Sequence, residues 1–274
     1  MPEIKSPLEL YKFLEKSNCR RCGLASCLAF SAAVIQGQKR LTDCPLLDQE
    51  TIEKLGGNVE KKESLEDDQG RVIQQLKEEI AKVDFNTAAP RLDAVLRNGK
   101  LGISCLGKSF WIDSSGEMAS DCHINTWVHI PLLHYILYCK GKQSNNDWVA
   151  FNQLKGAPEW NNFFSHRCEE SLRELADAHP DLVFEILHLF GAKPVSGATN
   201  ADQSLVIYPL PKVPFLINYW EPEDDFASKL NILFDRSAEN NINMQSIYLL
   251  GRGIVEMFRQ LIVKHSRDGK LFDK

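Results

Sequence analysis

The stretch Cys19-Arg-Arg-Cys22-Gly-Leu-Ala-Ser-Cys27, followed later by Cys44-Pro45, holds four of the eight cysteines of this 274-residue chain. Their spacing is Cys-x2-Cys-x4-Cys-x16-Cys. Thiolates are soft ligands, and a set of four suits zinc or an iron–sulfur cluster. The spacing therefore predicts a metal centre on Cys19, Cys22, Cys27 and Cys44.

The residues between the cysteines indicate how the four thiols can meet. Gly23 can adopt a positive φ, which lets the chain turn tightly beside a cluster. Residues 24–36 are mostly small or apolar and predict a helix that ends at Gly37. A helix of about twelve residues climbs roughly 18 Å, and six extended residues can return about 20 Å. Cys44 can therefore come back beside the other three cysteines.

This pattern resembles the small 4Fe–4S module of the large subunit of corrinoid iron–sulfur proteins and of the B subunit of the Rnf complex. The matching residues are Cys19, Cys22, Gly23, Cys27, Ala29, Phe30, Gly37, Cys44 and Pro45. The resemblance covers about the first fifth of the chain and implies a 4Fe–4S cluster on the four cysteines. Zinc is the alternative metal, although structural zinc sites usually carry two paired knuckles and only one Cys-x-x-Cys is present here. Four unligated thiols are the remaining alternative.

Composition and charge narrow the class of protein. Apolar residues make up 43% of the chain and charged residues 25%, as in ordinary soluble globular proteins. The net charge of −5 gives no reason to expect nucleic acid or an anionic membrane as a partner. Apolar runs such as 28–35 are too short to span a membrane, and the N-terminus lacks a signal-peptide core. Eight cysteines without an export signal indicate a reducing cytoplasm, and an oxygen-sensitive cluster indicates an anaerobic source.

The pattern along the chain predicts an α+β protein in three parts. These are a small helical 4Fe–4S domain over residues 1–57, a charged linker over 58–75, and a larger α+β domain of unknown function over 76–274. The larger domain is expected to contain an antiparallel or mixed sheet. Ser6-Pro7-Leu8-Glu9 is a capping box that opens the first helix. Gly56-Gly57 ends the last helix of the small domain.

The larger domain shows both helical and strand periods. Alternating apolar residues predict a β-hairpin over 101–112, and Ile130-Pro131 predicts the start of a helix. Further helices are expected at 159–177 and 180–190, strands at 205–208, 215–220 and 230–234, and a final helix over 244–262 that packs on the sheet. Pro209, Pro211 and Pro214 indicate that at least one of these strands lies at a sheet edge.

Residues 100–265 also resemble an uncharacterised (DUF-class) family of iron–sulfur protein domains that occurs in anaerobes beside this cluster module. The resemblance is carried by Leu133-His-Tyr-Ile-Leu137, Trp148-Val-Ala-Phe151, Pro209-Leu-Pro-Lys-Val-Pro214, Asp224-Asp-Phe226 and Leu233-Phe-Asp235. It implies a joint fold and a redox setting, and it implies no reaction.

The larger domain contains candidates for a second site. Soft ligands occur as two pairs, Cys122-His123 and His166-Arg-Cys168, which could bind a metal or a cobalt cofactor if the fold brings them together. The competing interpretation is structural, because free cysteine is among the most buried residue types. Common nucleotide, zinc-protease and hydrolase motifs are missing from the sequence. Gly251-Arg-Gly253 lies within a helical pattern and indicates close packing.

Two functions of different classes fit these observations. The first is electron transfer to a redox partner protein, or its reductive activation, with a corrinoid-dependent protein as one candidate partner. The second is a redox enzyme with a metal or cofactor site in the C-terminal domain. A third and weaker hypothesis is a cluster-dependent scaffold or redox sensor.

Overall fold

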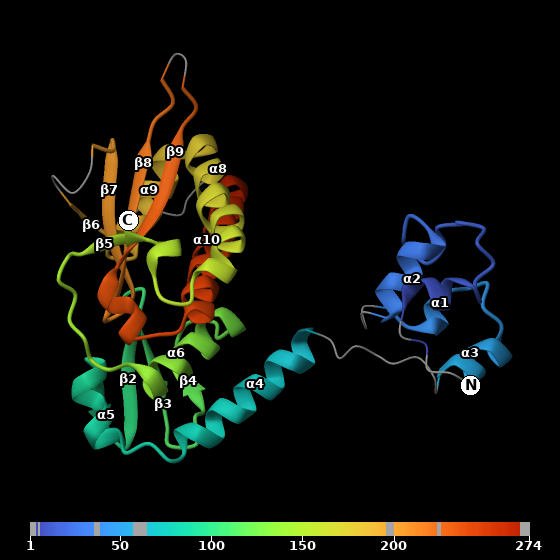
Figure 1. Cartoon of the computed structure of the whole chain (residues 1–274), viewed down its shortest axis with the longest axis horizontal. Helices are drawn as coiled ribbons and strands as arrows, with labels where there is room; N and C mark the ends of the chain where they lie inside the picture. Colours follow the sequence, from blue (N-terminus) through green and yellow to red (C-terminus); the bar gives the residue numbers. More distant parts are fainter. Residues whose placement is uncertain are drawn as a thin grey trace. The chain divides into compact units, whose positions relative to one another are not determined.

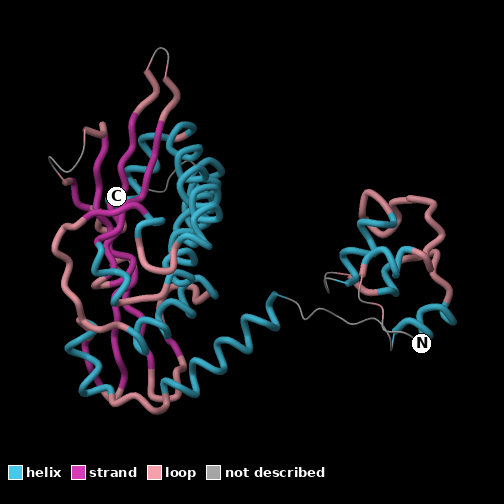
Figure 2. Tube along the Cα trace, viewed as in Figure 1, coloured by secondary structure: helices cyan, strands magenta, loops and turns pink. Residues whose placement is uncertain are grey.

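The computed structural model describes residue 4 and residues 6–35, 39–56, 65–195, 200–223 and 226–268. The chain forms two compact units, Met1–Val72 and Ile73–Lys274. Helix α4 (Leu65–Ile80) includes much of the segment predicted as a linker, and residues 57–64 lie outside the described part. Figure 1 labels the elements, and Figure 2 shows the mixture of helices and strands. All pairings between the named strands are antiparallel, so the fold is α+β, as predicted.

The first unit is helical, with α1 (Pro7–Tyr11), α2 (Cys27–Ile35), a 3₁₀ turn (Leu41–Asp43) and α3 (Gln49–Gly56). The predicted capping box is confirmed, because Ser6 and Glu9 each accept a hydrogen bond from the other's backbone N–H. Helix α2 begins at Cys27 and not at Leu24, since the Ser26 hydroxyl accepts a hydrogen bond from the Ala29 N–H and fixes the helix start. The predicted cap at Gly37 lies outside the described residues.

The core of the first unit is small but continuous. Leu10 and Phe30 are almost fully buried at its centre, and three of the four N-terminal cysteines pack against it. The buried members are Ile4, Leu10, Leu14, Phe30, Val34, Ile35, Leu41 and Leu55. Three cysteines of the predicted metal centre therefore also contribute to the packing of this unit.

The second unit begins with α5 (Phe85–Leu92) and a four-stranded antiparallel sheet in the order β1-β2-β3-β4. The strands are β1 (Val95–Arg97), β2 (Lys100–Cys105), β3 (Lys108–Ile112) and β4 (Met118–Ala119). The predicted hairpin is β2–β3, in which Cys105 lies opposite Lys108. Leu106 and Gly107 form its two-residue turn with φ of 49° and 74°, the positive pair that a tight hairpin requires.

A second antiparallel sheet has the order β5-β9-β8-β7-β6. Its strands are β5 (Trp148–Ala150), β6 (Lys193–Pro194), β7 (Gln203–Leu210), β8 (Val213–Trp220) and β9 (Lys229–Asp235). The prediction that proline places one of the three long strands at an edge is wrong, because short β5 and β6 occupy the edges. Pro209 lies at a register shift between Ile207 and Leu210, and Pro214 precedes the point where β8 begins to pair with β9. The prolines therefore interrupt no ladder hydrogen bonds.

The helices of the second unit differ from the predictions in two respects. Helix α6 (Thr126–Tyr138) begins before the expected Ile130-Pro131 start and contains Pro131 in its interior. The sequence predicts that the last helix packs on the sheet. Helix α10 (Met244–Asp268) instead packs mainly along α6 and lies beside α8 (Ser171–Ala178) (Figure 1). Among the described residues, no helix is both long and apolar enough to cross a membrane.

A helical stretch made of α7 (Asn161–Phe164), a π-helical turn (Ser165–Glu170), α8 and α9 (Pro180–Leu189) contacts β9 on one side and α10 on the other. The Phe164 ring stacks on Phe151 and meets Phe234 of β9 edge to face. Gly251 of α10 lies against the other side of this stretch, where an added Cβ would be 3.0 Å from the Phe164 ring. The predicted close-packing role of Gly251 is therefore confirmed.

Candidate metal centre

The four N-terminal cysteines line one pocket. Cys19 and Cys22 lie in the loop between α1 and α2, Cys27 is the first residue of α2, and Cys44 follows the 3₁₀ turn. Leu14, Phe30 and Pro45 complete the walls. The arrangement arises as expected from sequence: α2 carries the chain away and the next segment returns it to the start.

The loop that carries the first two cysteines has an unusual backbone. Lys16, Asn18 and Arg20 adopt φ of 59°, 49° and 60°, and Gly23 adopts 80°. Left-handed residues that alternate with ordinary ones turn successive backbone N–H groups toward a common side, and such nests bind anions, including iron–sulfur clusters. Three non-glycine residues held in this region store conformational energy, which is typical of binding sites.

A reciprocal pair of hydrogen bonds joins the loop to α2. The Asn18 backbone N–H donates to the Cys27 sulfur at 3.4 Å, and the Cys27 N–H donates to Asn18 Oδ1 at 2.8 Å. Cys27 also occupies the first turn of α2, where the helix dipole favours a negative charge. The Asn18 N–H and the N-terminal turn of α2 therefore both direct partial positive charge toward the Cys27 sulfur.

The pocket lies between the core and solvent. Cys22, Cys27 and Cys44 are half-buried and contact the core, whereas Cys19 is exposed. Arg20 and Arg21, next to Cys19, are exposed as well. A group bound by the four thiols would have one apolar side and one side open to water and to other proteins.

The donor set fits an iron–sulfur cluster, since four cysteines, the backbone nest and the apolar wall are the groups such clusters use. The cavity volume is only about 10 Å³, however, so the side chains must spread to admit a cluster. Exposed Cys19 can move without disturbing the core. In the described ranges, no three His, Cys, Asp or Glu side chains are arranged to hold a single metal ion.

The residues predicted for a second site lie at separate places. Cys122 and His123 line a cavity of the second unit together with Cys105. His166 Nδ1 is 2.7 Å from Glu170 Oε2 on the helix surface, and Cys168 is fully buried, 3.1 Å from where a Cβ on Gly251 would lie. Burial raises the pKa of Cys168 to about 12 and keeps its thiol neutral. A ligand role for this set remains a prediction.

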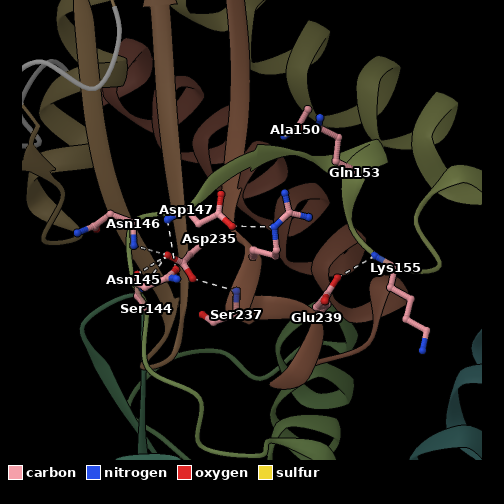
Figure 3. Close-up of polar contacts among 11 residues, drawn as sticks. Ser144, Asn145, Asn146, Asp147, Ala150, Gln153, Lys155, Asp235, Ser237 and Glu239 are labelled. Atoms are coloured by element: carbon pink, nitrogen blue, oxygen red, sulfur yellow. Dashed lines mark hydrogen bonds and ion pairs between the residues drawn. The ribbon is translucent and has the colours of Figure 1, made fainter.

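A polar cluster of the second unit surrounds Asp235, at the end of β9 (Figure 3). Its Oδ2 accepts hydrogen bonds from Ser144 Oγ and from the backbone N–H groups of Asn145 and Asn146, and its Oδ1 accepts one from the Ser237 N–H. Burial raises the pKa of Asp235, but these hydrogen bonds outweigh it and lower the pKa overall. Through these four hydrogen bonds, the Asp235 carboxylate fixes the loop at residues 144–146 to the end of β9.

Two features of the sites carry weak sequence signals. Asn is one of the few residue types that tolerate a left-handed backbone, so Asn18, directly before Cys19, gives a weak clue, whereas Lys16 and Arg20 give none. The proximity of Cys105 to Cys122 and Asn125 depends on how the β2–β3 hairpin meets the start of α6. That is a tertiary contact without a local pattern.

Comparison with known proteins identifies both parts of the chain. The family model described as "Domain of unknown function (DUF3786)" matches residues 84–257, which is more than half of the chain. The chain belongs to this family. A second model, described as "Putative Fe-S cluster", matches residues 14–46, the segment that holds the four cysteines. The predicted uncharacterised family and the iron–sulfur module are thereby confirmed.

Curated relatives match only a short part of the chain. Subunit gamma of the acetyl-CoA decarbonylase/synthase complex of Methanocaldococcus jannaschii is 37% identical over 54 residues, 20% of this chain and 11% of that protein. Subunit gamma 2 of Methanosarcina mazei is 47% identical over 45 residues, 16% of this chain and 10% of that protein. The chain thus spans about a tenth of the length of these relatives. No solved structure matches the chain.

Proposed function

We propose that the N-terminal unit binds one 4Fe–4S cluster through Cys19, Cys22, Cys27 and Cys44 and that the protein transfers single electrons in the cytoplasm of an anaerobe. The observation that carries this proposal is the convergence of the four thiols on one pocket beside a backbone nest. The match of residues 14–46 to the iron–sulfur family model supports the cofactor class.

The chain's own residues set the properties of the bound cluster. A 4Fe–4S cluster supplies a one-electron couple whose potential depends on hydrogen bonds to sulfur, local charge and solvent exposure. The Asn18 N–H bond to the Cys27 sulfur and the neighbouring cations of Arg20 and Arg21 favour the reduced form. Exposed Cys19 marks the side from which electrons enter or leave.

The proposed partner is a redox protein, with a corrinoid-dependent protein as the first candidate. Two arguments support that choice: the module resembles that of the corrinoid iron–sulfur proteins, and curated relatives of the chain are named as subunits of the acetyl-CoA decarbonylase/synthase complex. The cations of Arg20 and Arg21 beside Cys19 suit an acidic surface on such a partner.

The decisive experiment is anaerobic purification followed by measurement of iron, sulfide, zinc and cobalt per chain, with an EPR spectrum of the dithionite-reduced protein. About four irons and four sulfides with a reduced-cluster signal are expected. Cys44→Ser should lower iron and sulfide and abolish the native signal. Cys139→Ser, a buried cysteine of the second unit, is the matched control and should leave both unchanged. Zinc without sulfide would refute the cluster.

Electron transfer itself needs a separate test. The reduced protein is mixed with a cob(II)alamin-containing corrinoid protein, and cob(I)alamin formation is followed by its absorbance in a stopped-flow instrument. Arg20→Gln/Arg21→Gln should slow the reaction and reduce its dependence on ionic strength, whereas Arg259→Gln on α10 should not. A fully loaded cluster that transfers no electron would exclude this partner.

The second candidate function, a redox enzyme, is favoured by one observation. The DUF3786 domain contains a cavity of about 380 Å³ next to Cys122 and His123, two of the residues predicted for a second site. If Cys122→Ala abolishes turnover of a small-molecule substrate while the EPR signal of the cluster persists, the protein is a redox enzyme and not only an electron carrier.

A further inference from the structure

The cavity of the second unit has the size and depth of a small-molecule site. Its volume is about 380 Å³, within the range of about 300–1,000 Å³ that ligand pockets occupy. The β2–β3 hairpin, the start of α6, the residue after α9 and one face of α10 supply its walls. Leu106, Phe110 and Val128 are buried at its base, whereas Lys108, His123 and Gln260 are exposed and therefore mark its mouth.

One wall is a rigid aromatic surface. Trp127 lines the cavity and lies so close to α10 that a Cβ on Gly253 would be 2.1 Å from its ring. The indole therefore rests on bare helix backbone and cannot rotate toward α10. With Phe110 and Phe190, this wall suits the flat face of an aromatic ligand.

The cavity also contains an unpartnered hydrogen-bond acceptor. Asn125 Oδ1 is buried and accepts no hydrogen bond from any residue that the structure describes. Asn125 is the N-cap of α6, yet its side chain does not cap the helix, although Asn at this position ordinarily does. A buried acceptor without a donor is unfavourable, and a ligand N–H or O–H in the cavity would satisfy it.

The charges indicate which end of a ligand goes in first. Cys105, at the base, is buried beside Cys122, and burial raises its pKa to about 12, so its thiol is neutral at physiological pH. At the mouth, Lys108 is cationic, and the carboxylate of Glu256 is matched by Arg252 at 3.7 Å. A ligand would therefore place a neutral ring at the base and an anionic tail near Lys108.

We propose that this cavity binds a planar nitrogen heteroaromatic compound with a ring N–H and an anionic tail. The ring lies between Trp127 and the apolar base, and its N–H donates a hydrogen bond to Asn125 Oδ1. The anionic tail lies at Lys108. Flavin mononucleotide and pterin-6-carboxylate are two compounds of this class that serve as probes. The binding is independent of the N-terminal cluster, because all of the lining residues belong to the second unit.

The test is titration of the full-length protein with each probe, followed by probe and tryptophan fluorescence and by equilibrium dialysis. Saturable one-to-one binding of at least one probe is expected. Asn125→Ala should weaken it about tenfold, the effect of losing one hydrogen bond to a buried group. Met257→Trp should fill the cavity and abolish binding. Lys108→Gln should weaken flavin mononucleotide but not riboflavin, which lacks the phosphate.

Asn162→Ala on α7 and Val263→Trp on the exposed face of α10 are the matched controls and should bind as the unmodified protein does. Circular dichroism melts identify any variant that fails to fold. Because the Asn125 side chain caps nothing, Asn125→Ala tests the site without disturbing α6. The proposal is overturned if neither probe binds at about 1 mM, or if a bound probe is unaffected by both Asn125→Ala and Met257→Trp.

Discussion

Replacing Asp235 with Asn should destabilise the second unit far more than a one-atom change suggests. The carboxylate accepts four hydrogen bonds, three on Oδ2 and one on Oδ1, with donor–acceptor distances of 2.7–3.0 Å. An amide keeps one acceptor oxygen. If that oxygen serves Ser144, Asn145 and Asn146, the amide NH₂ faces the Ser237 N–H, and two donors oppose each other.

The magnitude follows from these contacts. Losing the charge-assisted bond to Ser237 and leaving its N–H unpaired costs about 1.5–3 kcal/mol, and weakening the other three bonds from charged to neutral costs roughly 0.5 kcal/mol each. The expected loss is about 3–4.5 kcal/mol. Asp147→Asn is the control in the same cluster, because Asp147 forms an exposed ion pair with Arg236, worth about 0.2–1 kcal/mol.

Urea denaturation followed by circular dichroism measures both variants. The effect of Asp235→Asn should also depend on pH, because the folded-state pKa of Asp235 lies below its unfolded value of about 3.9. Its stabilising contribution is complete above that value and is lost as the pH falls through the folded pKa, so the two proteins should converge in acid. A loss below about 1 kcal/mol, or an equal loss in Asp147→Asn, would refute this account of the cluster.

Two further predictions concern packing and thiol reactivity. Gly253→Ala should destabilise the protein by about 1–3 kcal/mol, measured as a lower urea midpoint, because the new methyl group meets the Trp127 ring; Gly70→Ala in α4, with open space around it, should be neutral or slightly stabilising. Iodoacetamide at pH 8 should modify half-buried Cys122 well before buried Cys105, whose pKa is about 12, as mass spectrometry of timed samples would show. Faster modification of Cys105 would mean that its thiol is not held neutral in the cavity.

Sequence patterns predicted the structure correctly where a feature depends only on residues close together in the chain. The Ser6–Glu9 capping box, the turn at Gly23 and the β2–β3 hairpin depend on residues within a few positions of one another, and each is present. The convergence of the four N-terminal cysteines is of the same kind, since one short helix and its return segment bring the four thiols to one pocket.

Where the predictions failed, tertiary context outweighed local preference. Pro131 suggested a helix start, but α6 begins before it and keeps a proline in its interior among buried neighbours. Pro209 and Pro214 suggested an edge strand, but a register shift and a late ladder start accommodate them inside the sheet. The cavity beside Asn125 could not be predicted, because its walls come from segments separated by most of the domain.

The contact between Gly253 and Trp127 has a consequence for how this family can diverge. A glycine in the middle of a long helix is unfavourable by itself, so nothing local preserves it. The indole leaves no room for even one carbon at this position. In an alignment of related sequences, a larger residue at 253 should therefore appear only where Trp127 has been replaced by a smaller one, so that the two positions vary as a pair.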